Sequence, residues 1–116
     1  MNRIKNIAVF VGYMLLVAFV SLRSPGEAAS VGSYDKAAHF LTYGVFAILA
    51  YRLHLSRRYG IYLYIAVVAY GGLMEVGQSF IPGREMSALD FLANTLGVTF
   101  GALLCDKIYA SLKETR

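Results

Sequence analysis

The chain has 116 residues, with 11 lysines and arginines against 7 aspartates and glutamates and a formal net charge of +4. Apolar residues make up 58% and charged residues only 16%, whereas soluble domains have roughly 45–50% and about 25%. This composition excludes an ordinary soluble domain and a disordered chain, and the length allows one domain over residues 1–116.

The charges fall in short islands that separate four uncharged stretches, residues 6–22, 37–51, 59–74 and 91–105. Each stretch is slightly shorter than the roughly 20 apolar residues that cross a bilayer, but its flanking residues can extend it. The stretches are apolar around most of the helix, which argues against a soluble four-helix bundle. We therefore predict an all-α membrane protein with four transmembrane helices, near residues 6–23, 35–55, 59–81 and 88–109.

The first apolar stretch permits a second interpretation. Its basic start and the small residues at 28–30 are also typical of a secretory signal peptide that is cleaved there. The apolar run is long for a signal peptide, and residues 23–26 separate it from the candidate cleavage site. We therefore favour a retained first helix.

The distribution of lysine and arginine predicts how the helices are oriented. If the N-terminus is cytoplasmic, that side holds eight of the basic residues, in the N-terminal segment, the 52–58 loop and the C-terminal segment. Most of the acidic residues lie at or near the other side. The positive-inside rule then predicts an N-in/C-in membrane protein, and topology explains the net charge without nucleic-acid binding.

Polar residues interrupt the apolar pattern in three clusters, and the predicted topology brings all three to the outer face. The first cluster opens the second helix with Asp35, Lys36, His39 and Tyr43. Asp35 can cap this helix or lie in its first turn. Asp35, His39 and Tyr43 are spaced four residues apart, so they share one helix face.

The second cluster closes the third helix. Glu75 and Gln78 follow a long apolar run, and Gly71 lies on the same helix face. A carboxylate at that depth must pair, protonate or line water, because an unpaired charge is costly there.

The third cluster surrounds the start of the fourth helix. Pro82-Gly83 indicates a turn, and Ser87-x-x-Asp90 resembles a capping box. Asn94 shares the helix face of Asp90. Arg84, in the loop beside this helix start, suits an anion.

These clusters together predict a polar site with the ingredients for acid–base chemistry or for binding a head group. The candidate catalytic residues are His39, Glu75 and Asp90. The candidate substrate-binding residues are Asp35, Lys36, Tyr43, Gln78, Arg84, Ser87 and Asn94. Asp35, His39 and Glu75 could also hold a metal, but their spacing is not typical of a metal motif, so no metal or cofactor is predicted.

Two blocks of this sequence resemble the VanZ-like family of small bacterial integral membrane proteins. They are Asp35-Lys36-x-x-His39-Phe40-x-x-Tyr43 and Glu75-x-x-Gln78-x-Phe80-x-Pro82-Gly83-Arg84-x-x-Ser87-x-x-Asp90-x-x-Ala93-Asn94-x-x-Gly97. The family's namesake is associated with resistance to the glycopeptide antibiotic teicoplanin. The resemblance implies that the matching residues form a shared site, but it supplies no mechanism.

With this resemblance, we expect a cell-envelope protein of the bacterial cytoplasmic membrane, surrounded by membrane lipids. Its outer-face site is expected to bind or process a lipid-linked or anionic envelope molecule, such as a glycolipid. Whether the site is enzymatic stays open, as do its ligand and the oligomeric state. One alternative is a non-catalytic accessory protein whose polar cluster is an interhelical network. A second is a proton or ion path through Glu75, which is disfavoured because no ionisable residue continues that path inward.

Overall fold

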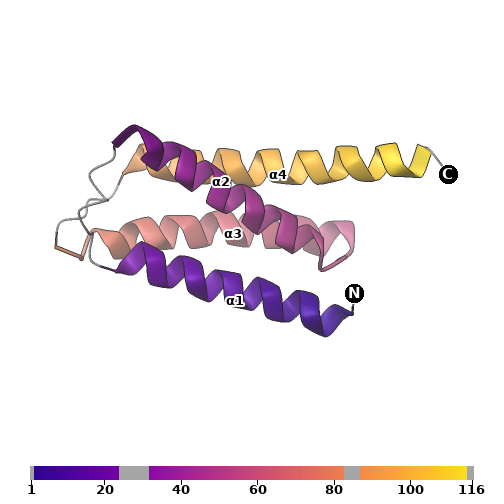
Figure 1. The fold of residues 1–116 in the computed structure, drawn as a ribbon, viewed down its shortest axis with the longest axis horizontal. Helices are drawn as coiled ribbons and strands as arrows, with labels where there is room; N and C mark the ends of the chain where they lie inside the picture. The colour runs from indigo at the N-terminus through magenta and orange to yellow at the C-terminus, as the bar shows by residue number, and fades with distance from the viewer. Residues whose placement is uncertain (1, 24–31, 83–86, 115–116) are drawn as a thin grey trace.

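The computed structural model describes residues 2–23, 32–82 and 87–114, with side chains for 2–23, 36–82 and 87–114. These residues form four α-helices and no strand: α1 (Arg3–Leu22), α2 (Gly32–Tyr51), α3 (Arg57–Gln78) and α4 (Ala88–Glu114). The helices run alternately up and down the long axis of the molecule (Figure 1). The end of α1, the start of α2, the end of α3 and the start of α4 therefore lie together, opposite the two termini.

The first and last helices, α1 and α4, are longer than predicted. α1 begins at Arg3 instead of residue 6, because the Asn2 side chain caps it by accepting a hydrogen bond from the Lys5 amide at 2.8 Å. α4 ends at Glu114 instead of residue 109. Its additional residues include good helix formers. The positive charge of Lys113 in the last turn interacts favourably with the negative end of the helix dipole.

The second and third helices, α2 and α3, end earlier than predicted. α2 ends at Tyr51 instead of residue 55, and His54 adopts a positive φ of 54° that no α-helix can contain. α3 ends at Gln78 instead of residue 81, and a tighter turn follows in which the Ile81 amide bonds the Gln78 carbonyl. Pro82 explains this end, since the residue before a proline avoids the helical conformation.

Three of the described helices, α1, α3 and α4, are long and apolar enough to span a membrane. This indicates a multi-pass membrane protein. α2 falls outside this set because its first turns carry Asp35, Lys36 and His39. It contacts each of the other three helices and makes its most extensive contact with α4, so its polar residues can face the inside of the bundle.

The core lies around Phe46 of α2, which is fully buried. The rings of Phe10, Tyr13, Tyr43 and Tyr70 pack against it at centroid separations of 5.2–5.7 Å. Large apolar side chains such as Leu15, Phe19 and Leu103 stay exposed on the outside of the bundle. This arrangement suits a lipid environment, in which outward apolar residues need no cover.

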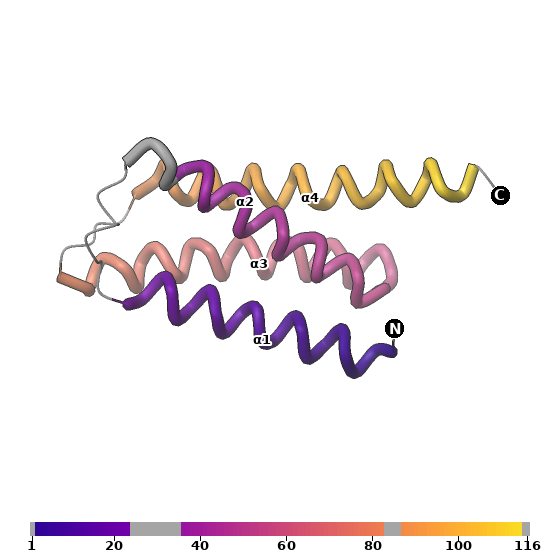
Figure 2. Tube along the Cα trace, viewed as in Figure 1, coloured from indigo at the N-terminus to yellow at the C-terminus, as the bar shows by residue number. Residues whose placement is uncertain are grey.

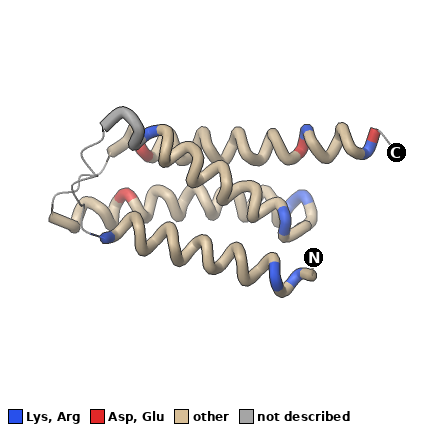
Figure 3. The backbone as a smooth tube through the Cα atoms, in the orientation of Figure 1, with Lys and Arg blue, Asp and Glu red and all other residues tan. Residues whose placement is uncertain are grey.

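The charged residues of the described helices lie toward the two ends of the bundle and leave its middle uncharged (Figure 3). Figure 2 shows α2 starting beside the first half of α4 and then crossing toward α3. α2 and α4 also make the most extensive contact between any two helices. The starts of these two helices therefore position polar residues of both against each other.

Candidate functional site

Glycines bring α2 and α4 into close contact just below the polar cluster. A Cβ atom on Gly97 would collide with the carbonyl oxygen of Phe40, and one on Gly101 would lie 2.6 Å from the carbonyl oxygen of Gly44. The two backbones can therefore approach this closely only where α4 has no side chain. One turn before Gly97, this contact places Asn94 opposite His39.

The imidazole of His39 is the centre of the site. Its Nδ1 lies 2.8 Å from Oδ1 of Asn94, and it also lies 4.0 Å from Oε1 of Glu75. Its Nε2 lies 3.5 Å from Oδ2 of Asp90. One histidine of α2 therefore faces an amide of α4 and carboxylates of α3 and α4.

Each carboxylate also accepts a hydrogen bond away from His39. Asp90 pairs through Oδ1 with the ammonium group of Lys36. Glu75 accepts the backbone N–H of Ser87 at Oε2, over 3.1 Å. These bonds tie the end of α3 and the start of α2 to the start of α4.

The start of α4 is capped differently from a standard capping box. The Ser87 hydroxyl accepts the Asp90 amide at 3.2 Å, as the sequence predicted. In a capping box the Ser87 amide would donate to Asp90, but here it donates to the Glu75 carboxylate of α3. The Asp90 carboxylate instead contacts Lys36 and His39. Capping this helix and assembling the polar cluster therefore use the same residues.

The cluster is shielded from solvent. Glu75 is 3% exposed, Asp90 6% and Asn94 1%, whereas the side chain of His39 keeps 18% of its surface accessible. Buried carboxylates with hydrogen-bond partners are stable in a low dielectric, and their fields act strongly on a neighbouring imidazole. His39 is thus more accessible to an incoming molecule than Glu75, Asp90 or Asn94.

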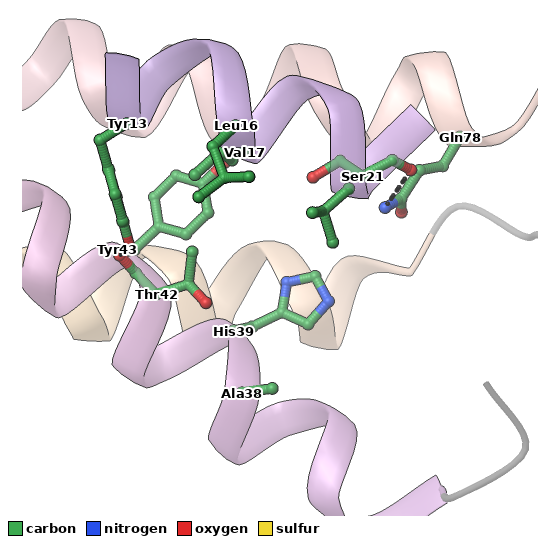
Figure 4. Close-up of a pocket in the computed structure, with 10 residues that line it drawn as sticks. Tyr13, Leu16, Val17, Ser21, Ala38, His39, Thr42, Tyr43 and Gln78 are labelled. Atoms are coloured by element: carbon green, nitrogen blue, oxygen red, sulfur yellow. Dashed lines mark hydrogen bonds between the residues drawn. The ribbon is translucent and has the colours of Figure 1, made fainter. Parts of the chain in front are cut away.

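A cavity of about 390 Å³ opens beside His39 between α1, α2 and α3. Figure 4 shows the imidazole pointing from α2 toward α1. Leu16, Val17 and Val20 of α1 give the cavity an apolar wall. Its polar lining residues are Tyr13, Ser21, His39, Thr42, Tyr43 and Gln78.

Three tyrosines near this cavity differ in how their hydroxyl groups are bonded. Tyr13 donates to the carbonyl of Thr42 at 2.6 Å, and Tyr70 donates to the carbonyl of Met14 at 2.7 Å. The hydroxyl of Tyr43 is buried and has no hydrogen-bond partner among the residues that the structure describes. A buried hydroxyl without a partner is costly, so Tyr43 keeps an unused capacity for a hydrogen bond within the described part of the chain.

The structure thus places eight of the predicted site residues in one region, the polar cluster around His39 or the adjoining cavity. They are Lys36, His39, Tyr43, Glu75, Gln78, Ser87, Asp90 and Asn94. The amide of Gln78, which lines the cavity, donates to the Ser21 carbonyl of α1 at 3.0 Å (Figure 4). α2 begins at Gly32, so Asp35 lies inside the helix and does not cap it. The side chain of Asp35 and the whole of Arg84 lie outside the described residues.

The sequence prediction missed the contribution of α1. It supplies the apolar wall of the cavity, the hydroxyl of Tyr13 and the carbonyl that holds Gln78. A tyrosine in the middle of an apolar helix was the available signal, because a buried phenol needs a partner on another helix.

Comparison with known proteins gives one family. The VanZ/LLP1 family model matches residues 1–109. An uncharacterised protein of Schizosaccharomyces pombe is 32% identical over 105 residues, which cover 88% of this chain and 63% of that relative. No solved structure matches the chain.

Proposed function

The chain belongs to the VanZ/LLP1 family, and on that premise we propose that it binds a lipid-linked, anionic molecule at the His39 cluster. The apolar part of the ligand lies along α1, and its polar head contacts His39 and Tyr43. The observation that carries this proposal is a cavity with an apolar wall that His39 and Tyr43 line, and the buried Tyr43 hydroxyl has no partner among the described residues. Lipid sites combine such a wall with a few convergent polar groups.

The proposal includes a topology in which α2 is a fourth membrane span and both termini are cytoplasmic. Nine lysines and arginines lie in the described residues, and seven of them belong to the end of the bundle that holds the termini and the α2–α3 connection (Figure 3). The positive-inside rule supports this orientation. The His39 cluster then lies at the outer leaflet of a cell membrane.

His39 contacts the bound head, and Asn94 orients its imidazole. Asn94 presents an amide oxygen to Nδ1, and such an oxygen only accepts, so Nδ1 carries the proton. The other nitrogen, Nε2, lies 3.5 Å from Oδ2 of Asp90. Lys36 supplies positive charge at the same end, and Arg84 remains a sequence-based prediction for holding the anion.

The existence of a relative in a eukaryote, Schizosaccharomyces pombe, bears on the ligand. It favours a class of lipid common to bacterial and eukaryotic membranes over a molecule peculiar to bacterial walls. A role in teicoplanin resistance in a bacterial envelope would follow as a secondary effect of binding such a lipid. Susceptibility to teicoplanin, measured with and without the chain in a bacterial host, tests that secondary role.

The experiment compares the two histidines, His39 in the first half of α2 and His54 in the connection between α2 and α3. Wild type, His39→Ala and His54→Ala are purified in detergent, and co-purifying lipids are quantified by mass spectrometry. We expect wild type and His54→Ala to retain about one defined anionic lipid per chain and His39→Ala to lose it. Equal retention by both variants, or no retained lipid in wild type, would contradict the proposal.

His39→Ala can also weaken the bundle, because His39 bonds Asn94. His39→Gln is therefore measured beside it, since glutamine keeps a donor for the Asn94 amide but has no basic nitrogen. We expect a folded His39→Gln protein to retain the lipid. If the cluster is only an interhelical network, both variants lose thermal stability and any retained lipid is unaffected in the folded fraction.

A further inference from the structure

We propose that His39, Glu75 and Asp90 bind a divalent metal ion. One ligand atom from each of the three residues lies within 4.8 Å of the other two. The residues come from α2, α3 and α4, and both carboxylates are buried. An imidazole with two carboxylates is a nitrogen and oxygen donor set that suits Zn²⁺ or Mn²⁺.

The first support is the orientation of His39. Asn94 is almost fully buried and fixes the proton on Nδ1, over 2.8 Å. Nε2 then faces an oxygen of the Asp90 carboxylate at 3.5 Å, and a cation bound between these two atoms would have both as ligands. A hydrogen bond from the remote nitrogen to an oxygen is also the usual second contact of a metal-binding histidine.

The second support is that the two oxygens of each carboxylate make different contacts. Oδ1 of Asp90 contacts Lys36, and the oxygen near His39 is Oδ2. Oε2 of Glu75 accepts the Ser87 amide, and the oxygen nearer His39 is Oε1. Each carboxylate is thus oriented by one oxygen and presents the other toward the imidazole.

The distances are close to those of a metal centre. Bonds of about 2.1 Å to a tetrahedral ion separate its ligand atoms by about 3.4 Å. The Nε2–Oδ2 separation of 3.5 Å already has this value. The ligand atoms of the three residues all lie within 4.8 Å of one another, so any two of them have to approach by about 1.4 Å at most.

The ion would explain how an acidic site holds an anionic head group. Glu75 and Asp90 alone repel such a head, whereas a bound divalent ion attracts it. The cavity beside His39, with the unpartnered Tyr43 hydroxyl, provides the space for that head. This role of the ion rests on the proposed function, but binding of the ion itself does not.

The test uses protein purified in detergent, stripped with EDTA and incubated with Zn²⁺ or Mn²⁺. Metal content is measured after desalting, and thermal unfolding is followed at increasing metal concentration. The variants are Glu75→Gln and Asp90→Asn, which keep size and remove the charge. Asp106→Asn is the matched control, because Asp106 is exposed and belongs to the last part of α4.

We expect about one ion per chain and a concentration-dependent rise in Tm for wild type and Asp106→Asn, and neither for the two site variants. The absence of a retained ion in wild type, or an equal one in the site variants, would overturn the inference. Lipid retention by the stripped wild type separates the two proposals. If lipid is retained while neither metal binds, the metal inference fails and the proposed function stands. If the metal binds but the wild-type protein retains no lipid, the proposed function fails and the metal inference stands.

Discussion

Nδ1 of His39 lies 2.8 Å from Oδ1 of Asn94, and this contact is one of those that join α2 to α4 inside the bundle. It decides which nitrogen of His39 is basic and where the imidazole points. The glycine contact one turn deeper holds the two helices close enough for the bond to form. Stability and function therefore depend on the same pair of helices.

Asn94→Ala should weaken the bundle. The substitution removes the partner of His39 from a position that is 1% exposed. Interhelical hydrogen bonds in membrane proteins contribute about 0.6 kcal/mol on average and up to about 1.7 kcal/mol, so we expect a loss of this order or slightly more. Thermal unfolding in detergent measures it. Thr99→Val is the control, since the Thr99 hydroxyl bonds only the Thr95 carbonyl of its own helix.

Gly97→Ala should separate α2 from α4. The new methyl group would collide with the Phe40 carbonyl, and backbone cannot give way as a side chain can. We expect a loss of about 1–3 kcal/mol and a displaced His39. Gly12→Ala is the matched control, because nothing lies within 4 Å of its Cβ position and alanine favours the helix. Equal stability of the two variants would show that the close approach is not needed.

Lys36→Met and Asp90→Asn should be coupled. Either change alone leaves one member of the ion pair without its partner, whereas the double variant removes both charges. We expect the double variant to be more stable than the sum of the single losses by about 0.5–3 kcal/mol. A double-mutant cycle of unfolding free energies measures this coupling. Additive losses would mean that the pair contributes nothing to stability.

Much of this architecture could be predicted from charge spacing and periodicity. The four helices and the convergence of His39, Glu75, Asp90 and Asn94 follow from where apolar runs start and end. The helix ends could be predicted less well. The Asn2 cap and the positive φ of His54 shift them by several residues, and both depend on local contacts.

The partners within the site could not be predicted either. Ser87-x-x-Asp90 indicated a cap, but a single helix gives no sign that Glu75 would replace Asp90 in it. The cavity depends on α1, whose apolar residues carry no sign of what they face. Contacts between helices that are distant in sequence decide both features.

The tyrosines provide the most direct measurement of the central claim, which is that the cavity beside His39 binds a lipid. Tyr43→Phe and Tyr70→Phe are compared for unfolding free energy and for the amount of lipid that co-purifies. We expect Tyr43→Phe to keep its stability within about 0.5 kcal/mol, because the hydroxyl has no partner among the described residues, and to lose lipid. We expect Tyr70→Phe to lose about 1 kcal/mol, because its bond to Met14 is broken, and to keep its lipid. The opposite pattern, in which Tyr43→Phe is less stable but retains lipid as wild type does, would contradict the account.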